Sequence, residues 1–236
     1  AKRLIMTGNV LTSNNEKVFT AGEKYSVDEK FRIKGDQKRF VSRGGEKLAY
    51  GLKVFNKKLD DAIVLDIGSS TGGFTDVSLK AGAKLVYALD VGTNQLDWKL
   101  RNNPRVVSME QTNFRYSKPE DFKNGRPDFA CIDVSFISLQ LIFPPLVEIL
   151  PINGEVIALI KPQFEALQED IGAGGIVNDL NVYNYVLKDI IDEAQNLNLE
   201  LKGLDISPIK GTKGNIEFLG YFKKVADISD DNEKFI

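Results

Sequence analysis

One segment indicates the fold most clearly: Ile63-Val64-Leu65-Asp66-Ile67-Gly68-Ser69-Ser70-Thr71-Gly72-Gly73-Phe74. Its first half is a nearly continuous apolar run, which is typical of a strand buried on both faces of a parallel sheet. Three glycines follow, and a helix is predicted from about residue 73 to residue 81. In an open α/β sheet, a ligand binds at this kind of strand-to-helix junction.

Apolar runs separated by polar turns continue along the chain. Their alternation with helical segments is typical of a doubly wound α/β domain. The last two strands follow each other without a helix and predict a hairpin at a sheet edge. We therefore expect residues 61–226 to form a Rossmann-like domain with a seven-stranded mixed sheet and helices on both faces. Strands are predicted at 63–67, 84–90, 106–109, 129–133, 155–160, 199–206 and 216–222, and a long helix at 182–197.

Residues 1–36 have a different sequence pattern, with short β-like segments separated by many turn residues. They predict the end of a helix closed by Gly8, followed by small strands. So few apolar residues could hardly fold alone, and we expect this segment either to pack against something else or to lack its own beginning. The small strands are predicted near residues 9–12, 17–19 and 31–34.

Charge is distributed unevenly along the chain. The sequence has 31 Lys or Arg and 33 Asp or Glu, a net charge of −2, yet residues 1–60 hold 14 of the basic and only 7 of the acidic residues. A basic front, which includes a connector at 37–60 with a helix at about 46–55, suggests contact with a polyanion. An unevenly charged solvated surface is the alternative. Residues 227–236 are predicted to be a polar tail.

Composition excludes several function classes. The chain has one cysteine and no histidine, so it has no internal disulfide, and a zinc site or a histidine base is not expected. A reducing cytoplasm fits this cysteine usage. No apolar run reaches the ~20 residues that a membrane-spanning helix needs. Any acid–base chemistry is left to Lys, Asp, Glu or Tyr.

The glycine loop predicts a cofactor site. It lacks the G-x-G-x-x-G spacing that suits a dinucleotide pyrophosphate. Its leading carboxylate, Asp66, would repel a pyrophosphate but can face the ammonium of a cationic amino-acid ligand. A glycine-rich turn without a ligand is the alternative. The other candidate cofactor-binding residues of the loop are Gly68, Ser69, Thr71, Gly72, Gly73 and Phe74.

Polar residues after the next two strands extend this site. Asp90 closes the second strand, where a carboxylate can accept hydrogen bonds from ribose hydroxyls. The third strand ends in polar groups that could read an adenine edge, although ordinary polar groups also end strands. These candidates are Glu110, Gln111, Thr112 and Asn113.

Asp133 and Lys161 follow the fourth and fifth strands and form the candidate catalytic pair. A partly buried Lys beside an Asp can act on a hydroxyl, or the two can simply close the sheet as an ion pair. Lys47 and Glu217, the latter predicted on the last strand, could complete a polar cluster. Cys131 lies inside an apolar strand, so we interpret it as a packed hydrophobe rather than a nucleophile.

At this point the sequence resembles the TlyA family, often labelled hemolysin A, whose catalytic domain is similar to FtsJ-type RNA 2′-O-methyltransferases. The resemblance covers nearly the whole chain. It rests on Ser42-Arg43-Gly44-Gly45-Glu46-Lys47-Leu48, on the glycine loop through Asp76, on Ile132-Asp133-Val134-Ser135-Phe136-Ile137-Ser138-Leu139, on Ile160-Lys161-Pro162-Gln163-Phe164-Glu165 and on Lys213-Gly214-Asn215-Ile216-Glu217-Phe218.

The resemblance implies a class I methyltransferase fold, S-adenosylmethionine as methyl donor, also touching Asp133, and a cytidine 2′-hydroxyl of ribosomal RNA as acceptor. It implies a catalytic tetrad formed by Lys47, Asp133, Lys161 and Glu217, with RNA or ribosomal subunits as partners and no metal. It also implies that the first segment is the later part of an S4 RNA-binding domain. Candidate RNA-binding residues are Lys2, Arg3, Arg43 and Lys47.

In this interpretation Lys161 lowers the pKa of the hydroxyl or takes its proton, Asp133 orients Lys161, and the other two residues position the ribose. Gly172-Ala173-Gly174-Gly175 could be a lid, or an ordinary turn. Three rival functions remain open: a membrane-active cytolysin, an RNA-binding protein that holds the cofactor without catalysis, and a nucleotide-dependent oxidoreductase.

Overall fold

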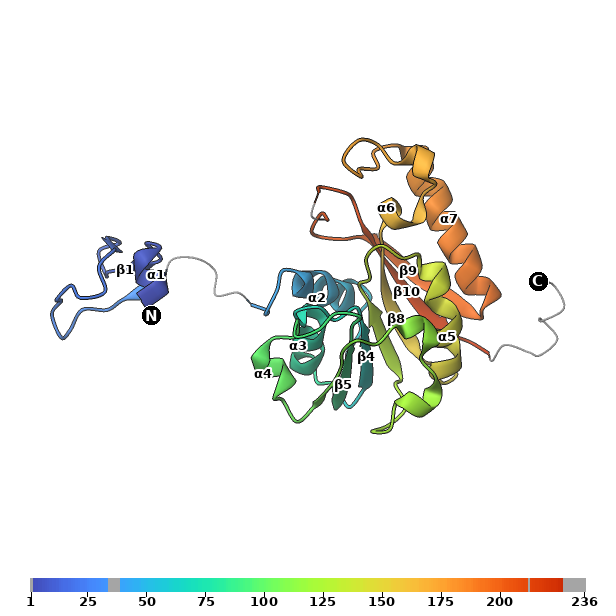
Figure 1. Ribbon diagram of the computed structural model, residues 1–236, viewed down its shortest axis with the longest axis horizontal. Coiled ribbons are helices and arrows are strands. Elements are labelled where there is room, and N and C mark those ends of the chain that lie inside the picture. Colours follow the sequence, from blue (N-terminus) through green and yellow to red (C-terminus); the bar gives the residue numbers. More distant parts are fainter. Residues whose placement is uncertain (1, 34–38, 212, 227–236) are drawn as a thin grey trace. The chain divides into compact units, whose positions relative to one another are not determined.

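The computed structural model describes residues 2–33, 39–211 and 213–226 (Figure 1). It divides the chain into two compact units, Ala1–Arg39 and Phe40–Ile236. Each is described by itself.

The first unit is a short helix and a small sheet. Helix α1 spans Lys2–Met6 and ends at Gly8, whose φ of +66° is the left-handed conformation that glycine adopts at little cost. The predicted helix end is therefore confirmed. The antiparallel sheet has the order β2-β1-β3, with strands at Val10–Leu11, Lys17–Val18 and Arg32–Ile33.

The second unit contains a seven-stranded mixed sheet with the order β6-β5-β4-β7-β8-β10-β9 (Figure 1). The first five strands in this order are parallel, and β10 pairs antiparallel with both β8 and β9. The predicted edge hairpin of the last two strands is confirmed. The strands are β4 Ile63–Ile67, β5 Leu85–Leu89, β6 Val106–Met109, β7 Phe129–Ile132, β8 Glu155–Ile160, β9 Leu199–Ile206 and β10 Phe218–Lys224.

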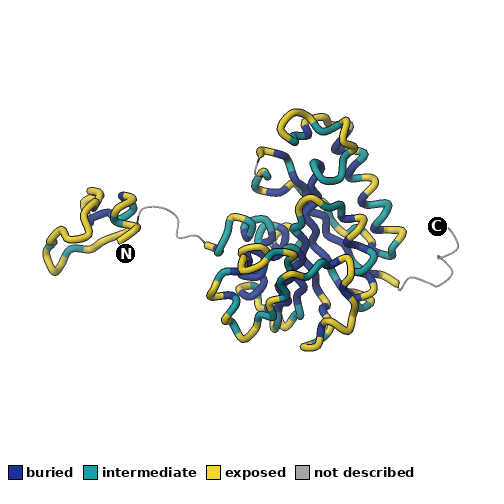
Figure 2. The backbone as a smooth tube through the Cα atoms, in the orientation of Figure 1, coloured by how far each residue is buried: buried dark blue, intermediate teal, exposed yellow. Residues whose placement is uncertain are grey.

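Helices cover both faces of this sheet, and Figure 2 shows the buried strands between them. One core lies under α2, α3 and α4 and includes Leu48 and Phe74. The other lies under α5 and α7 and includes Phe143 and Ile190. Because side chains alternate along a strand, Val64 and Leu65 enter different cores. The helices are α2 Gly44–Val54, α3 Gly73–Lys80, α4 Trp98–Arg101, α5 Phe143–Ile149, α6 Pro162–Glu165 and α7 Leu180–Asn196, with 3-10 turns at Phe114–Tyr116, Pro119–Asp121, Leu139–Leu141 and Gln168–Asp170.

Two of the differences from the sequence expectation have a clear physical reason or affect a predicted site residue. α5 was not predicted, because Pro144 and Pro145 interrupt the apolar run; they lie in its first turn, where a proline costs no helical hydrogen bond. β10 begins at Phe218, so Glu217 precedes the strand instead of lying on it. Across the described parts of the chain, no helix is both long and apolar enough to cross a bilayer.

Candidate active site

Four carboxylates lie along the carboxyl ends of four adjacent strands. The parallel register of β6, β5, β4 and β7 aligns the last residues of these strands with one another. Asp66 is the penultimate residue of β4, and Asp90, Glu110 and Asp133 directly follow β5, β6 and β7. This edge of the sheet suits a cationic ligand with hydroxyl groups better than a pyrophosphate.

The strand alternation brings the predicted catalytic residues to one face of the sheet. Asp133, Lys161 and Glu217 each lie two residues from a core residue under α2, namely Cys131, Leu159 and Leu219. The pairing of β10 with β8 sets Phe218 opposite Ile160, which places Glu217 beside Lys161. Lys47 reaches the same edge from the second turn of α2.

Three ion pairs join these four side chains into one cluster. The Lys161 Nζ atom lies 2.5 Å from Asp133 Oδ1, and the Lys47 Nζ atom lies 2.6 Å from Glu217 Oε2. Asp133 Oδ2 links the pairs at 3.9 Å from Lys47 Nζ. Glu217 is 3% exposed and Lys161 7% exposed. The structure therefore brings all four predicted residues together at the sheet edge.

Lys161 has further acceptors that the sequence did not reveal. Its Nζ donates to the Val134 carbonyl at 2.8 Å and to Ser135 Oγ at 3.2 Å. With Asp133, these supply three acceptors, which matches the three N–H groups of an ammonium. Its charge also lies 5.7 Å from the centre of the Phe164 ring.

Glu217 also has a second partner that the sequence did not reveal. Gln163 Nε2 donates to Glu217 Oε1 at 3.3 Å, while Gln163 Oε1 is buried and has no hydrogen-bond partner within the described parts of the chain. A Cβ atom on Gly211 would come within 2.5 Å of Glu217 Oε1, so a side chain at this position would displace the carboxylate. The position of Gln163, two residues after Lys161, was the signal available in the sequence.

The segment after β7 is tied to the segment after β8 by contacts outside the ion pairs. The Leu139 N–H donates to Glu165 Oε1 at 2.9 Å, and the Phe136 and Phe164 rings lie 5.0 Å apart. Burial raises the pKa of Glu165 to about 7. Phe136 is 89% exposed, an apolar ring presented beside the cluster that sequence reasoning did not single out.

The glycines of the loop after β4 are explained by contacts within the protein. A Cβ on Gly68 would come within 2.5 Å of the Asp133 carbonyl oxygen, and one on Gly73 within 2.3 Å of Ser42 Oγ. Gly72 packs in the same way against α4. These close approaches hold the loop against the segment of Asp133 and the start of α2. These packing contacts account for the small residues at these positions, and the cofactor-binding role of the loop stays a prediction.

Asp66 is completely buried between β4 and α3. Its Oδ2 accepts from Thr75 Oγ1 at 2.6 Å, and its Oδ1 has no hydrogen-bond partner among the described residues. Burial raises the pKa of Asp66 from 3.8 to about 7. The carboxylate lies beneath the loop rather than on its surface. Ser69 and Phe74 are also buried, whereas Thr71 is exposed.

The Asp90 side chain holds the glycine loop through hydrogen bonds to backbone N–H groups. Its Oδ2 accepts from the Ser70 N–H at 2.8 Å and its Oδ1 from the Gly92 N–H at 2.7 Å. Since each carboxylate oxygen can accept twice, Asp90 keeps capacity for ribose hydroxyls. Its partly exposed position at the end of β5 agrees with that role.

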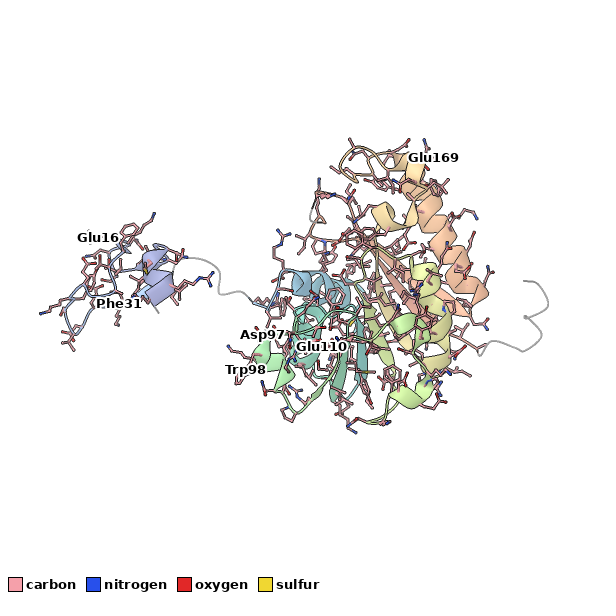
Figure 3. All side chains as sticks on the ribbon, viewed as in Figure 1. Glu16, Phe31, Asp97, Trp98, Glu110 and Glu169 are labelled. Atoms are coloured by element: carbon pink, nitrogen blue, oxygen red, sulfur yellow. The ribbon has the colours of Figure 1, made fainter. Side chains whose placement is uncertain are left out.

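The polar residues after β6 have mixed surroundings. Glu110 forms an ion pair with Arg101 of α4. Figure 3 labels Glu110 together with Asp97 and Trp98, the residues at the start of α4. Thr112 donates to the Glu110 carbonyl, and Asn113 caps a 3-10 turn. Gln111 is exposed with a positive φ.

The remaining predicted residues belong to other parts of the sequence. Lys2 and Arg3 are exposed on α1 in the first unit, and Arg43 is exposed immediately before α2. Cys131 is fully buried, and burial raises the pKa of its thiol well above the ordinary value, as expected for a packed residue. Among the described residues, no group of three acidic or cysteine side chains is placed to hold a metal ion.

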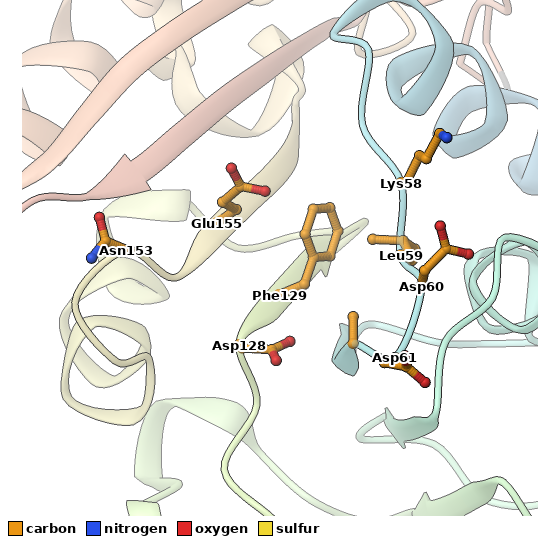
Figure 4. A pocket seen from close by; sticks show the side chains of 9 residues that line it. Lys58, Leu59, Asp60, Asp61, Asp128, Phe129, Asn153 and Glu155 are labelled. Carbon is orange, nitrogen blue, oxygen red and sulfur yellow. The ribbon is translucent and has the colours of Figure 1, made fainter.

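A pocket at the opposite edge of the sheet is separate from this site (Figure 4). Its lining includes Asp128 and Glu155, which lie where β7 and β8 begin. The remaining lining residues are Lys58, Leu59, Asp60, Asp61, Ala62, Phe129 and Asn153.

Comparisons with known proteins agree with this geometry. The family described as FtsJ-like methyltransferase matches residues 40–224. The Bacillus subtilis protein named "Putative rRNA methyltransferase YqxC" is 53% identical over 219 residues, 93% of this chain and 78% of that protein. The Mycobacterium tuberculosis protein named 16S/23S rRNA (cytidine-2′-O)-methyltransferase TlyA is 39% identical over 195 residues, 83% of this chain and 72% of that protein.

Solved structures share the architecture. The "Putative hemolysin from Streptococcus thermophilus" is 52% identical with a TM-score of 0.80, covering 99% of this chain and 85% of that one. N-methyltransferase NodS from Bradyrhizobium japonicum, in complex with S-adenosyl-l-homocysteine, is 11% identical with a TM-score of 0.54, covering 80% and 89%; it shares the fold alone. Sheet order, helical layers and matched residues lead to one conclusion: the chain belongs to the FtsJ-like methyltransferase family.

Proposed function

We propose that this chain transfers a methyl group from S-adenosylmethionine to the ribose 2′-hydroxyl of a cytidine in ribosomal RNA. The observation that supports this most is the cluster of Lys47, Asp133, Lys161 and Glu217, joined by three ion pairs at the carboxyl edge of the sheet. A cytidine in ribosomal RNA is proposed because the Mycobacterium tuberculosis relative is named for that activity.

The residues at the sheet edge fit the methyl donor. When bound, S-adenosylmethionine supplies an electrophilic methyl group on a cationic sulfonium. Asp90 lies where it can accept from ribose hydroxyls, and the carboxylates at the neighbouring strand ends favour a cationic ligand. The unpartnered, fully buried Oδ1 of Asp66 gives the site a further acceptor beneath the loop.

Lys161 acts on the acceptor hydroxyl. As an ammonium it donates a hydrogen bond to the 2′-oxygen, which lowers the pKa of that hydroxyl and stabilises developing negative charge. A C–O bond forms as the C–S bond breaks, the electron pair of the broken bond stays on sulfur, and the hydroxyl proton leaves to Asp133 or to water. Asp133 holds Lys161 in line, while Lys47 and Glu217 position the ribose.

The first unit is proposed to be part of an S4-like RNA-binding domain, with Lys2, Arg3 and the exposed Arg43 contacting phosphates. Phe136, exposed beside the cluster, can stack on an unstacked base. Ribosomal subunits are the proposed partners and the cytoplasm the proposed location.

The test is transfer of a labelled methyl group to ribosomal subunits, followed by digestion of the RNA to nucleosides. Label in 2′-O-methylcytidine is expected with the wild-type chain and not with Lys161→Ala. Label on a base, or on the ribose of another nucleoside alone, would contradict the proposed acceptor. A chain that binds the donor but methylates no RNA would contradict the proposed activity.

A further inference from the structure

We propose that Ser135 is a positioning residue, whose hydroxyl holds one N–H group of Lys161 until the substrate 2′-hydroxyl takes its place. This inference rests on the proposed function above. It starts from the three acceptors around Lys161: Asp133 Oδ1 at 2.5 Å, the Val134 carbonyl at 2.8 Å and Ser135 Oγ at 3.2 Å.

These three acceptors use every N–H group of the Lys161 ammonium. A substrate hydroxyl can therefore accept from Lys161 only if one existing contact gives way. Lys161 is 7% exposed, and a nearly buried charge that loses an acceptor without replacement is costly. An exchange of one acceptor for another avoids that cost.

Ser135 is the contact that can be exchanged. Its hydroxyl makes the longest of the three hydrogen bonds, and it is a neutral acceptor on an exposed residue. Asp133 is held by charge, and the Val134 carbonyl is part of the backbone. The hydrogen bond from Lys161 to Ser135 is thus the weakest of the set and the one open to an incoming RNA.

The exchange replaces one alcohol oxygen with another. Ser135 Oγ and a ribose 2′-oxygen are both hydroxyl oxygens, so either can accept from the same N–H group with similar geometry. The exchange breaks no covalent bond and moves no charge. Lys161 stays in one place, aligned by Asp133, before and after the substrate arrives.

The backbone around Ser135 keeps its hydroxyl in this position. The next residue, Phe136, has a φ of +61°, which turns the chain immediately after Ser135. Two contacts hold this turn and the chain that follows it against the segment after Lys161. The Phe136 ring contacts the Phe164 ring, and the Leu139 N–H donates to Glu165. Ser135 and Lys161 are therefore fixed relative to each other by more than their own contact.

The activity test compares Ser135→Ala with Ser135→Thr, which keeps the hydroxyl, and with Ser108→Ala, a matched change at an exposed serine on β6. Ser135 contacts Lys161 only until the substrate hydroxyl arrives, so Ser135→Ala removes a competing acceptor from the free protein and leaves the reacting complex unchanged. We expect a wild-type single-turnover methylation rate at saturating RNA and a half-saturating RNA concentration about tenfold lower. Donor affinity should not change, and Ser135→Thr should return the half-saturating concentration toward the wild-type value. An unchanged half-saturating concentration, a lower rate at saturating RNA, or a loss of donor binding would overturn the proposal.

A second measurement needs no RNA. In ¹H–¹⁵N spectra of the lysine ammonium groups, Lys161 should give a slowly exchanging signal that disappears in Lys161→Met. Ser135→Ala should speed its proton exchange about tenfold, because one donor is released to water. Unchanged exchange would overturn the proposal alone, whereas a wild-type chain that methylates no ribosomal RNA would overturn the proposed function.

Discussion

At the scale of single residues, alternation along the strands decides which side chains meet. Asp133, Lys161 and Glu217 come from different parts of the chain, yet each follows the same parity as a core residue under α2. A shift of one residue in any of these strands would turn its carboxylate or ammonium toward the α5 and α7 core. The cluster is thus a consequence of sheet register.

Asp66 predicts a pH-dependent stability. Its pKa is raised by burial to about 7 from 3.8, so its carboxyl favours folding while protonated, and that contribution is lost as pH rises from about 4 to 7. The loss is on the order of 4 kcal/mol for this group. Glu165, with a pKa raised to about 7, acts in the same direction.

Urea unfolding of the apoprotein at pH 5, 6, 7 and 8 measures this effect. The free energy of unfolding should decrease as the pH rises in the wild type, and it should decrease less steeply in Asp66→Asn. The control is Asp189→Asn, at an exposed position of α7, which should follow the wild-type slope. An unchanged slope in Asp66→Asn would show that the buried carboxyl does not titrate in this range.

At the scale of elements, α5 shows how long-range contacts stabilise a helix that local sequence does not announce. Buried Lys224, on β10, donates to the Val147 carbonyl at 2.6 Å and the Leu150 carbonyl at 3.0 Å, at the end of α5. Arg126 donates to the Ile149 carbonyl at 2.6 Å. Cations at this end also face the negative end of the helix dipole.

Lys224→Met should lower the free energy of unfolding by about 2 kcal/mol, because it leaves buried carbonyls without a donor. Lys223→Met is the matched control, since Lys223 is the adjacent, less buried residue on the same strand and alternation turns it to the other face. Urea unfolding of both variants checks this. Equal losses would mean that charge on β10, rather than the contact with α5, provides the stabilisation.

The sequence predicted the elements that local pattern determines. The apolar runs of β4, β7 and β8 were visible because these strands are buried on both faces. α5 was missed because its prolines resemble a break, and Glu217 was assigned to the strand that it precedes. The pair of Asp133 and Lys161 was predicted from their positions after two strands, with Lys47 and Glu217 as candidates to complete a polar cluster, and the resemblance to a family implied the full tetrad. The contacts of Ser135 and Gln163 depend on how distant segments pack, which no local pattern records.

At the scale of the whole molecule, the basic residues of the first 60 positions are divided between the two units. Each phosphate that a cation neutralises steepens the salt dependence of RNA binding. Lys2→Ala combined with Arg3→Ala should therefore weaken binding to ribosomal RNA and reduce the slope of log affinity against log salt by roughly 1.5. Filter binding over a range of salt concentrations measures this.

The control removes the same charge elsewhere, with Lys123→Ala and Lys188→Ala at exposed positions of the second unit. It should leave the slope near the wild-type value. If both pairs reduce the slope equally, RNA attraction follows total charge and the first unit has no special part in it.

Relatives of this chain carry the name hemolysin, so a lysis assay tests whether it also acts on membranes. Lysis by Lys161→Ala protein would indicate a membrane activity independent of methyl transfer.

We propose that the cluster around Lys161 takes part in methyl transfer and is not merely a structural set of ion pairs at the edge of the sheet. The most direct measurement pairs calorimetric titration of Lys161→Ala with S-adenosylmethionine and a single-turnover methylation assay on ribosomal subunits. Lys161→Ala should bind the donor with an affinity within about twofold of wild type and transfer the methyl group about a thousandfold more slowly. A parallel loss of donor binding and transfer, or transfer at the wild-type rate, would contradict it.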